Sequence, residues 1–187
     1  MPESFITIRP TCIFDPAQGG GLYVPIGYHY SNEDYEDGRI VVSRRDNMDG
    51  LTEIEKKAEL FLRAAHEEGE ALRKGALYLW QDLRVAKYLW EFRGKTSDPR
   101  KYLYTMQYDE ADFIHAGDLR HYTVLKNAVK EGKPLHDATA ARYWDGTPAD
   151  APQMEILVKK TTVKSRIELP QTPADVMRKF FEQAKKG

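Results

Sequence analysis

Residues 76–89, ALYLWQDLRVAKYL, change from one secondary-structure pattern to another within a few positions. The run begins with consecutive apolar and aromatic side chains, which is typical of a buried strand. The run from residue 82 to 92 then predicts a helix. The side chains available to pack this helix are Leu83, Ala86, Tyr88 and Trp90. The stretch therefore predicts a strand joined directly to a helix.

Strands and helices are interspersed on both sides of this unit. Residues 51–73 predict one long amphipathic helix, with Thr52 and Glu55 at capping-box spacing. The other predicted helices are residues 121–132, 137–144 and about 173–186, and the other predicted strands are 5–10, 21–30, 39–43, 101–108, 154–160 and 161–169. The last two strands look like a paired unit. Because regular βαβ alternation is missing, the pattern favours an α+β fold.

Composition narrows the class of protein. A chain of 187 residues with 41% hydrophobic and 30% charged side chains fits one globular domain. The 28 basic and 29 acidic residues give a net charge of -1, so no global field attracts nucleic acid or a membrane. With no signal-like or membrane-spanning run, we expect a cytoplasmic protein. The single cysteine, Cys12, excludes an intrachain disulfide and a cysteine-rich zinc site.

Several common catalytic motifs fail on spacing. The GKT at residues 94–96 lacks the earlier glycine of a phosphate-binding loop, because position 89 is leucine. HEEGE at residues 66–70 lacks the second histidine of a zinc protease, so no metal site is expected. No Gly-x-Ser-x-Gly sequence occurs, which leaves acyl transfer by an activated serine without support.

Three other features remain, in a fixed order along the chain. GYHYSN at residues 27–32 ends a predicted strand with a histidine between two tyrosines. Tyr78 lies in the strand described above. Gln153 and Glu155 lie two apart in a predicted strand and so project on the same face. Each feature alone also fits a core or edge residue.

The order His29-x-Ser31, Tyr78 and Gln153-x-Glu155 resembles the H-Y-E branch of the ADP-ribosyltransferase superfamily, which includes diphtheria-type toxins and poly(ADP-ribose) polymerases. The closing segment is similar to small bacterial and phage members, including DarT-like toxins. The resemblance spans about residues 22–168 of a single domain, 1–187. It implies two packed small β-sheets flanked by helices, with an NAD cleft between them. The family often carries glycine where this chain has Ala76, which affects the donor loop.

The resemblance also implies roles for individual residues. Glu155 would bind the 2′-hydroxyl of the nicotinamide ribose and stabilise the developing positive charge. Tyr78 would stack on the nicotinamide ring, and Tyr88 would close its other face. His29 would bind a ribose hydroxyl, while Ser31 and the backbone beside it would hold the carboxamide. The implied NAD-binding residues are His29, Tyr30, Ser31, Arg73, Tyr78 and Tyr88.

Some residues keep two interpretations. Arg73 is a candidate for the NAD pyrophosphate, and on position alone it fits a surface residue equally well. Gln153, a candidate for acceptor binding, can offer only hydrogen bonds where arginine-modifying relatives commonly carry a glutamate. The last strands carry a group of basic residues that suits either nucleic-acid phosphates or a solvated sheet edge: Lys159, Lys160, Lys164 and Arg166.

The function expected from this resemblance is mono-ADP-ribosyl transfer from NAD, as co-substrate, to a macromolecular acceptor, either protein or nucleic acid. Such an enzyme would act as a toxin-type or phage effector. One alternative is an NAD glycohydrolase, with water in place of the acceptor. Another is a non-catalytic binding module that retains the fold.

Overall fold

The computed structural model describes residues 12–13, 24–43, 46–93 and 102–169. The strands are β1 Cys12–Ile13, β2 Val24–Ser31, β3 Ile40–Val42, β4 Leu77–Trp80, β5 Tyr102–Gln107, β6 Phe113–Asp118, β7 Met154–Val158 and β8 Lys160–Ile167. The α-helices are α1 Glu53–Ala64, α2 Gly69–Lys74, α3 Leu83–Arg93, α4 Leu119–Lys130 and α5 Asp137–Trp144. Short 3-10 helices occupy Asn47–Gly50 and Glu110–Asp112. The strand predicted at residues 5–10 and the helix at 173–186 lie outside the described residues.

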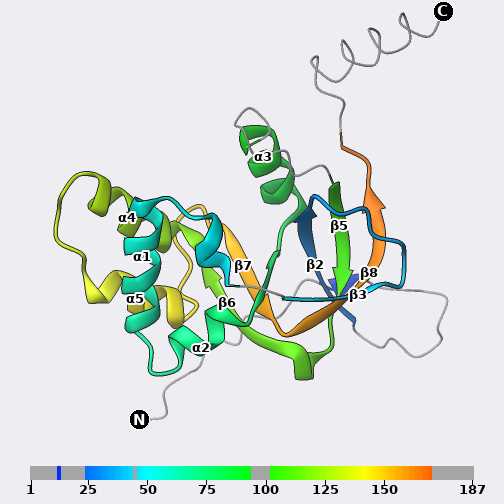
Figure 1. The fold of residues 1–187 in the computed structure, drawn as a ribbon, viewed down its shortest axis with the longest axis horizontal. Helices are drawn as coiled ribbons and strands as arrows, with labels where there is room; N and C mark the ends of the chain where they lie inside the picture. Colours follow the sequence, from blue (N-terminus) through cyan, green and yellow to red (C-terminus); the bar gives the residue numbers. More distant parts are fainter. Residues whose placement is uncertain (1–11, 14–23, 44–45, 94–101, 170–187) are drawn as a thin grey trace, which may run out of the picture.

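The fold is α+β, as the sequence predicts. Among the described residues, the strands follow the order β3-β8-β5-β2-β4-β7-β6, with β1 paired to β2 beside this path. Neighbouring strands are antiparallel throughout. Figure 1 shows β6 and β7 on one side of this open sheet and β5 and β8 on the other.

The sheet is nearly interrupted at its centre, between β2 and β4. Strand β2 pairs with β5 from Ile26 to Ser31, but it meets β4 only at the pair Tyr28 and Trp80. We call this junction the seam. The prediction of two separate packed sheets is wrong, because the strands are joined in one hydrogen-bonded order. The sheet instead has two halves that share the seam.

The strand pairing predicted at the end of the chain is also wrong. Strand β7 pairs with β4 and β6, whereas β8 pairs with β3 and β5. Only Lys159 separates the two strands, and even the tightest common hairpin needs two loop residues. The chain therefore bends once at Lys159 and passes from one half of the sheet into the other, as the orange ribbon in Figure 1 shows.

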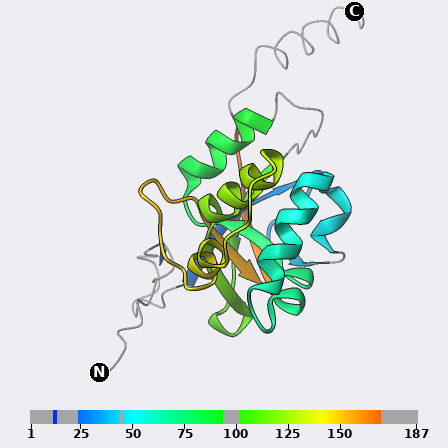
Figure 2. The ribbon, with the colours of Figure 1, turned by 90° about the vertical axis from the view of Figure 1, so that its left-hand side faces the viewer.

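Helices α1, α4 and α5 pack together on one part of the sheet, and α3 packs on another. Helix α4 packs against both α1 and α5, and this group lies together in Figure 1, beside β6 and β7. Figure 2 shows the group from its outer side. The apolar core beneath it is formed by Ala58, Leu62, Leu125, Ala140 and Tyr143. Helix α3 stands apart and packs on the seam through a cluster that includes Tyr30, Trp80, Ala86 and Leu103.

The long helix predicted over residues 51–73 is divided into α1 and α2. The predicted cap is confirmed, since Thr52 and Glu55 form a capping box. Gly69 permits the break, because the chain turns back so closely there that a Cβ would lie 2.2 Å from the Arg63 carbonyl oxygen. In one straight helix, Glu59 and Arg73 would be about 21 Å apart. Here Arg73 Nε lies 2.7 Å from Glu59 Oε1, because the chain turns back between them.

Strand β6 was not predicted from the sequence. Its sequence, FIHAGD, lacks a continuous apolar run and carries glycine and aspartate, which are uncommon in strands. It forms the edge of the sheet, where pairing with β7 supplies its partner. Its last residue, the buried Asp118, caps α4 by accepting a hydrogen bond from Arg120 N.

We predict that Gly27→Ala destabilises the protein at the seam. A Cβ at Gly27 would lie 2.8 Å from Leu79 Cβ, which cannot move without shifting β4. Overpacking of this kind should lower the free energy of unfolding by about 1–3 kcal/mol in urea denaturation. Gly50→Ala is the matched control, because nothing lies within 4 Å of its added Cβ. Equal stability of the two variants would contradict the close packing at the seam.

Candidate functional site

The strands that carry the three predicted catalytic residues are consecutive neighbours in the sheet. His29 lies on β2, Tyr78 on β4 and Glu155 on β7, in the order β2-β4-β7. His29 Nδ1 is 3.0 Å from the Tyr78 carbonyl oxygen, so the two are in contact across the seam. Tyr78 pairs with Leu157 in register, which makes Glu155 its diagonal neighbour on the same face. The fold thus brings together residues that are far apart in the sequence.

Glu155 is bound by two donors on one oxygen. Its side chain is buried, and Oε1 accepts hydrogen bonds from Arg73 Nη1 at 2.9 Å and from the Tyr143 hydroxyl at 2.6 Å. Arg73 Nη1 also donates to the Tyr143 hydroxyl. These three side chains form a closed triangle that connects α2, α5 and β7.

Arg73 is not a surface residue, so that interpretation is wrong. Its guanidinium is buried and forms a two-pronged contact with Glu59, Nε to Oε1 at 2.7 Å and Nη2 to Oε2 at 3.1 Å. The remaining nitrogen faces Glu155 and Tyr143. A role at the NAD pyrophosphate would require this arginine to exchange carboxylates for phosphate.

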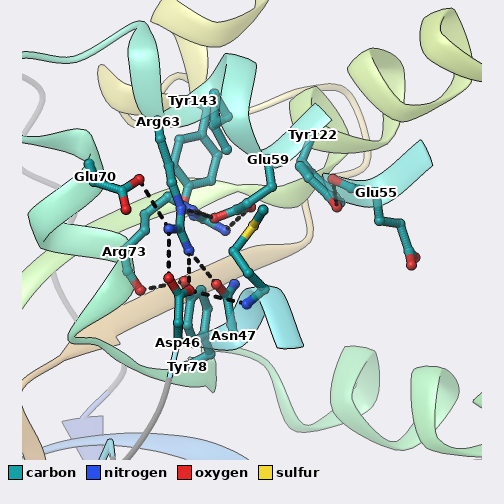
Figure 3. A network of polar contacts seen from close by, with 12 residues as sticks. Asp46, Asn47, Glu55, Glu59, Arg63, Glu70, Arg73, Tyr78, Tyr122 and Tyr143 are labelled. Carbon is teal, nitrogen blue, oxygen red and sulfur yellow. Dashed lines mark hydrogen bonds and ion pairs between the residues drawn. The ribbon is translucent and has the colours of Figure 1, made fainter. Parts of the chain in front are cut away.

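Figure 3 shows that the network extends to a second buried arginine. Arg63 Nε donates to Glu59 Oε1 at 2.9 Å. Its outer nitrogens donate to side chains from the segment before α1 and from α2: Asp46, Asn47 and Glu70. Glu59 therefore lies between two guanidinium groups, and each arginine has at least two polar partners. We call Glu59, Arg63, Arg73, Tyr143 and Glu155 the arginine network.

The charges of the network shift the pKa values of its members. Burial alone would raise the pKa of Glu59, but Arg73 and Arg63 outweigh burial and lower it. Burial opposes the charged form of Arg73, yet Tyr143 and Glu155 beside it raise the pKa of the guanidinium. Burial also raises the pKa of the Tyr143 hydroxyl, which keeps this group protonated and able to donate. Glu59, Arg63 and Arg73 are therefore charged, and the Tyr143 hydroxyl is neutral.

Arg73 contacts Tyr78 at two places, the hydroxyl and the ring. Its hydroxyl donates to the Arg73 carbonyl oxygen at 2.8 Å, and Arg73 Cζ lies 5.1 Å from the centre of its ring. Burial raises the pKa of this hydroxyl as well. Tyr88 does not close over this ring, since it is 61% exposed on α3, where the chain packs through Leu83, Ala86 and Leu89 instead. Helix α3 thus presents a different side to the sheet from the one that includes Tyr88.

The remaining predicted residues lie around the ends of β2 and β7. Ser31 is buried, and its hydroxyl accepts a hydrogen bond from Glu33 N at 3.0 Å. Tyr30 packs in the cluster beneath α3. Gln153 lies just before β7, where its backbone N–H donates to Asp118 Oδ1 at 2.9 Å. Asp118 thus fixes the backbone two residues before Glu155.

The basic residues of the last strands are partly paired. Lys160 lies 3.5 Å from Asp112, and Arg166 lies 3.5 Å from Asp34. Arg166 also lies over the Tyr102 ring, 4.3 Å from its centre. Lys159 and Lys164 are exposed. These contacts fit an exposed part of the sheet.

Sequence reasoning missed Glu59, Arg63 and Tyr143. The i,i+4 spacing of Glu59 and Arg63 was the one available signal, since such pairs stabilise helices. Tyr143 and Arg73 are separated by 70 positions, and Arg73 and Glu155 by 82, so no local pattern connects them.

A cavity of about 220 Å³ lies away from the predicted site residues. It is lined by Pro25, Gln81, Tyr108, Glu110, Phe113, Ala116 and Ile156. Ile156 belongs to the apolar face of β7, opposite Glu155, so this cavity opens on the other face of the sheet. It is not the NAD cleft that the sequence predicts.

None of the helices in the described part of the chain has the length and apolar character of a membrane span. Within the same residues, no three histidine, cysteine or carboxylate side chains gather as they would around a metal ion.

No protein-family model matches the chain, and no curated protein matches it either. The residues and their geometry therefore carry the functional argument.

We predict that Glu59→Gln destabilises the protein by about 3–5 kcal/mol, because it leaves Arg63 and Arg73 buried without their shared carboxylate. Glu53→Gln on the same helix is the control. Its side chain is 82% exposed and pairs with Lys56, so the change should stay within about 0.5 kcal/mol. Urea denaturation at pH 7 measures both. A Glu59→Gln protein as stable as the control would show that the network contributes little.

We predict that His115 makes the protein less stable as the pH falls. Burial lowers the pKa of His115 to about 4, while its unfolded value is near 6.5. The unfolded state therefore binds more protons between these values, and stability decreases as the pH drops from about 6.5 to 4. Comparing chemical denaturation of the wild type and His115→Gln across this range should show a flatter curve for the variant.

Proposed function

We propose that this protein is an NAD-dependent mono-ADP-ribosyltransferase that modifies a macromolecule, either protein or nucleic acid. One observation carries the proposal. His29, Tyr78 and Glu155 lie on three neighbouring strands: His29 contacts the Tyr78 carbonyl oxygen, and Arg73 links the Tyr78 hydroxyl to Glu155. The resemblance in their sequence order is independent of this spatial proximity. Their convergence supports an ADP-ribosyltransferase-like arrangement around the seam.

The chemistry needs few groups, which suits this set. Nicotinamide leaves a cationic precursor as a neutral molecule, so no general acid is required, and the barrier lies in the oxocarbenium-like ribose. One carboxylate placed against the ribose can stabilise that charge. In the proposed enzyme this carboxylate is Glu155, the ring of Tyr78 binds nicotinamide, and His29 binds a ribose hydroxyl. No metal takes part in this step.

The burial of Glu155 supports a second candidate. A carboxylate that is 4% exposed and bound to Arg73 is also what a purely structural ion pair would look like. Under this alternative the protein is a non-catalytic binding module, and the network serves stability alone. NAD hydrolysis is the remaining enzymatic alternative, and it differs from transfer only in using water as the acceptor.

We predict that Glu155→Gln strongly lowers turnover but retains NAD binding. Glutamine keeps the volume and a hydrogen-bond acceptor while removing the charge, so kcat for nicotinamide release should fall on the order of 10² to 10³, with NAD affinity changed only a fewfold. Glu168→Gln, an exposed carboxylate beyond β8, is the control and should match the wild type. Nicotinamide release and calorimetric NAD binding are measured side by side, with circular dichroism to confirm folding.

The same assay separates the alternatives. Labelled NAD incubated with a cell lysate should label a macromolecule if the protein is a transferase, whereas free ADP-ribose formed without lysate indicates hydrolysis. A wild-type protein that neither binds NAD nor releases nicotinamide is the binding module. Unchanged nicotinamide release by a folded Glu155→Gln protein would remove Glu155 from the reaction.

A further inference from the structure

The arginine network donates hydrogen bonds to only one of the two oxygens of the Glu155 carboxylate. Arg73 Nη1 and the Tyr143 hydroxyl both donate to Oε1, so Oε2 receives neither of these hydrogen bonds. An ionised carboxylate has about four acceptor positions, and two donors on one oxygen leave the other oxygen able to accept. The network therefore fixes the plane of the carboxylate through one atom and leaves the second atom for another partner.

Arg73 does not depend on Glu155 for its position. Its Nε and Nη2 are held by both oxygens of Glu59, and Glu59 is held in turn by Arg63. Because two of the three guanidinium nitrogens are fixed in this way, Nη1 is aimed at Glu155 by the helices α1 and α2.

Tyr143 is held even more tightly by its surroundings. Its ring packs on Gly117 of β6, where a Cβ would lie 2.5 Å from Tyr143 Cε2. Trp144 meets the ring edge-on with 5.3 Å between the ring centres. His115 Nε2 lies 3.0 Å from the Tyr143 carbonyl oxygen, which can only accept, so this nitrogen carries the proton. The hydroxyl is thus aimed at Glu155 by a rigid set of contacts.

We propose that Tyr143 is a positioning residue for Glu155, supported by Arg73, and that it holds Oε1 so that Oε2 can meet the ribose of NAD. Tyr143 touches neither the substrate nor the reacting bond in this scheme and acts only through the carboxylate. The inference rests on the proposed function, because its readout is turnover of NAD. It goes further by assigning a task to α5, whose sequence carries none of the predicted site residues.

The test compares Tyr143→Phe with Tyr122→Phe. Each change removes one hydroxyl and keeps the ring, and the Tyr122 hydroxyl donates to the Glu55 carbonyl oxygen at 3.2 Å and not to Glu155. In Tyr143→Phe, kcat for nicotinamide release should fall roughly tenfold, because a loosely held carboxylate spends less time in the productive position. KM for NAD should stay within about threefold. Tyr122→Phe should match the wild type in both constants.

Gly117→Ala provides a second variant that removes no polar group. The added Cβ must displace the Tyr143 ring and its hydroxyl, so kcat should fall in the same way with KM retained. This variant decides the matter if Tyr143→Phe does not fold, as judged by near-ultraviolet circular dichroism. If neither variant folds, Tyr143 is a structural residue and the inference is overturned.

The inference and the proposed function fail in different ways. A wild-type protein without NAD binding or nicotinamide release overturns both. If the wild type is active, Glu155→Gln is inactive and a folded Tyr143→Phe protein turns over NAD like the wild type, then the function stands and the positioning role alone is wrong. An equal loss of kcat in Tyr143→Phe and Tyr122→Phe would also overturn the positioning role, since it would reflect general loosening of the helices.

Discussion

The two-pronged contact between Arg73 and Glu59 is the interaction on which the other contacts of this structure depend. It fixes α2 against α1, and the third nitrogen of the same guanidinium reaches β7 through Glu155 and α5 through Tyr143. One side chain thus connects three helices to the sheet. Without this arginine, the carboxylates of Glu59 and Glu155 and the Tyr143 hydroxyl would lose the cation that joins them.

Such a network determines geometry more than it adds stability. Taking charged groups out of water costs several kcal/mol per ion, and a well-packed apolar set of the same volume is often equally stable. Apolar contacts, however, tolerate sliding, whereas a guanidinium bound by two carboxylates at 2.7 and 2.9 Å does not. The arginine network therefore specifies how α1, α2 and α5 sit on β7, and the apolar core formed by Ala58, Leu62 and their neighbours supplies the driving force for folding.

The sequence predicted local structure well and failed where distant segments meet. Apolar periodicity located α1, α3, α4, α5 and most strands, because each pattern lies within a dozen residues. It missed the turn after Ala64, since the contact between Gly69 and Arg63 that breaks the helix is a matter of tertiary packing. It also missed β6, because this segment forms a strand by pairing with β7 and its amino-acid composition does not favour a strand. The contacts that join Arg73 to Tyr143 and to Glu155 span 70 and 82 positions, which no local pattern records.

The single-residue bend at Lys159 limits how this chain can change in length. Strand β7 is buried at four consecutive positions before the bend, and β8 buries Thr161 and Val163 after it. One inserted or deleted residue at the bend would reverse the faces of one strand, turning either Glu155 or Val163 toward the wrong side. The segment from Glu155 to Val163 should therefore keep a constant length in related chains, while surface loops vary freely. That spacing is the property by which distant relatives could be recognised.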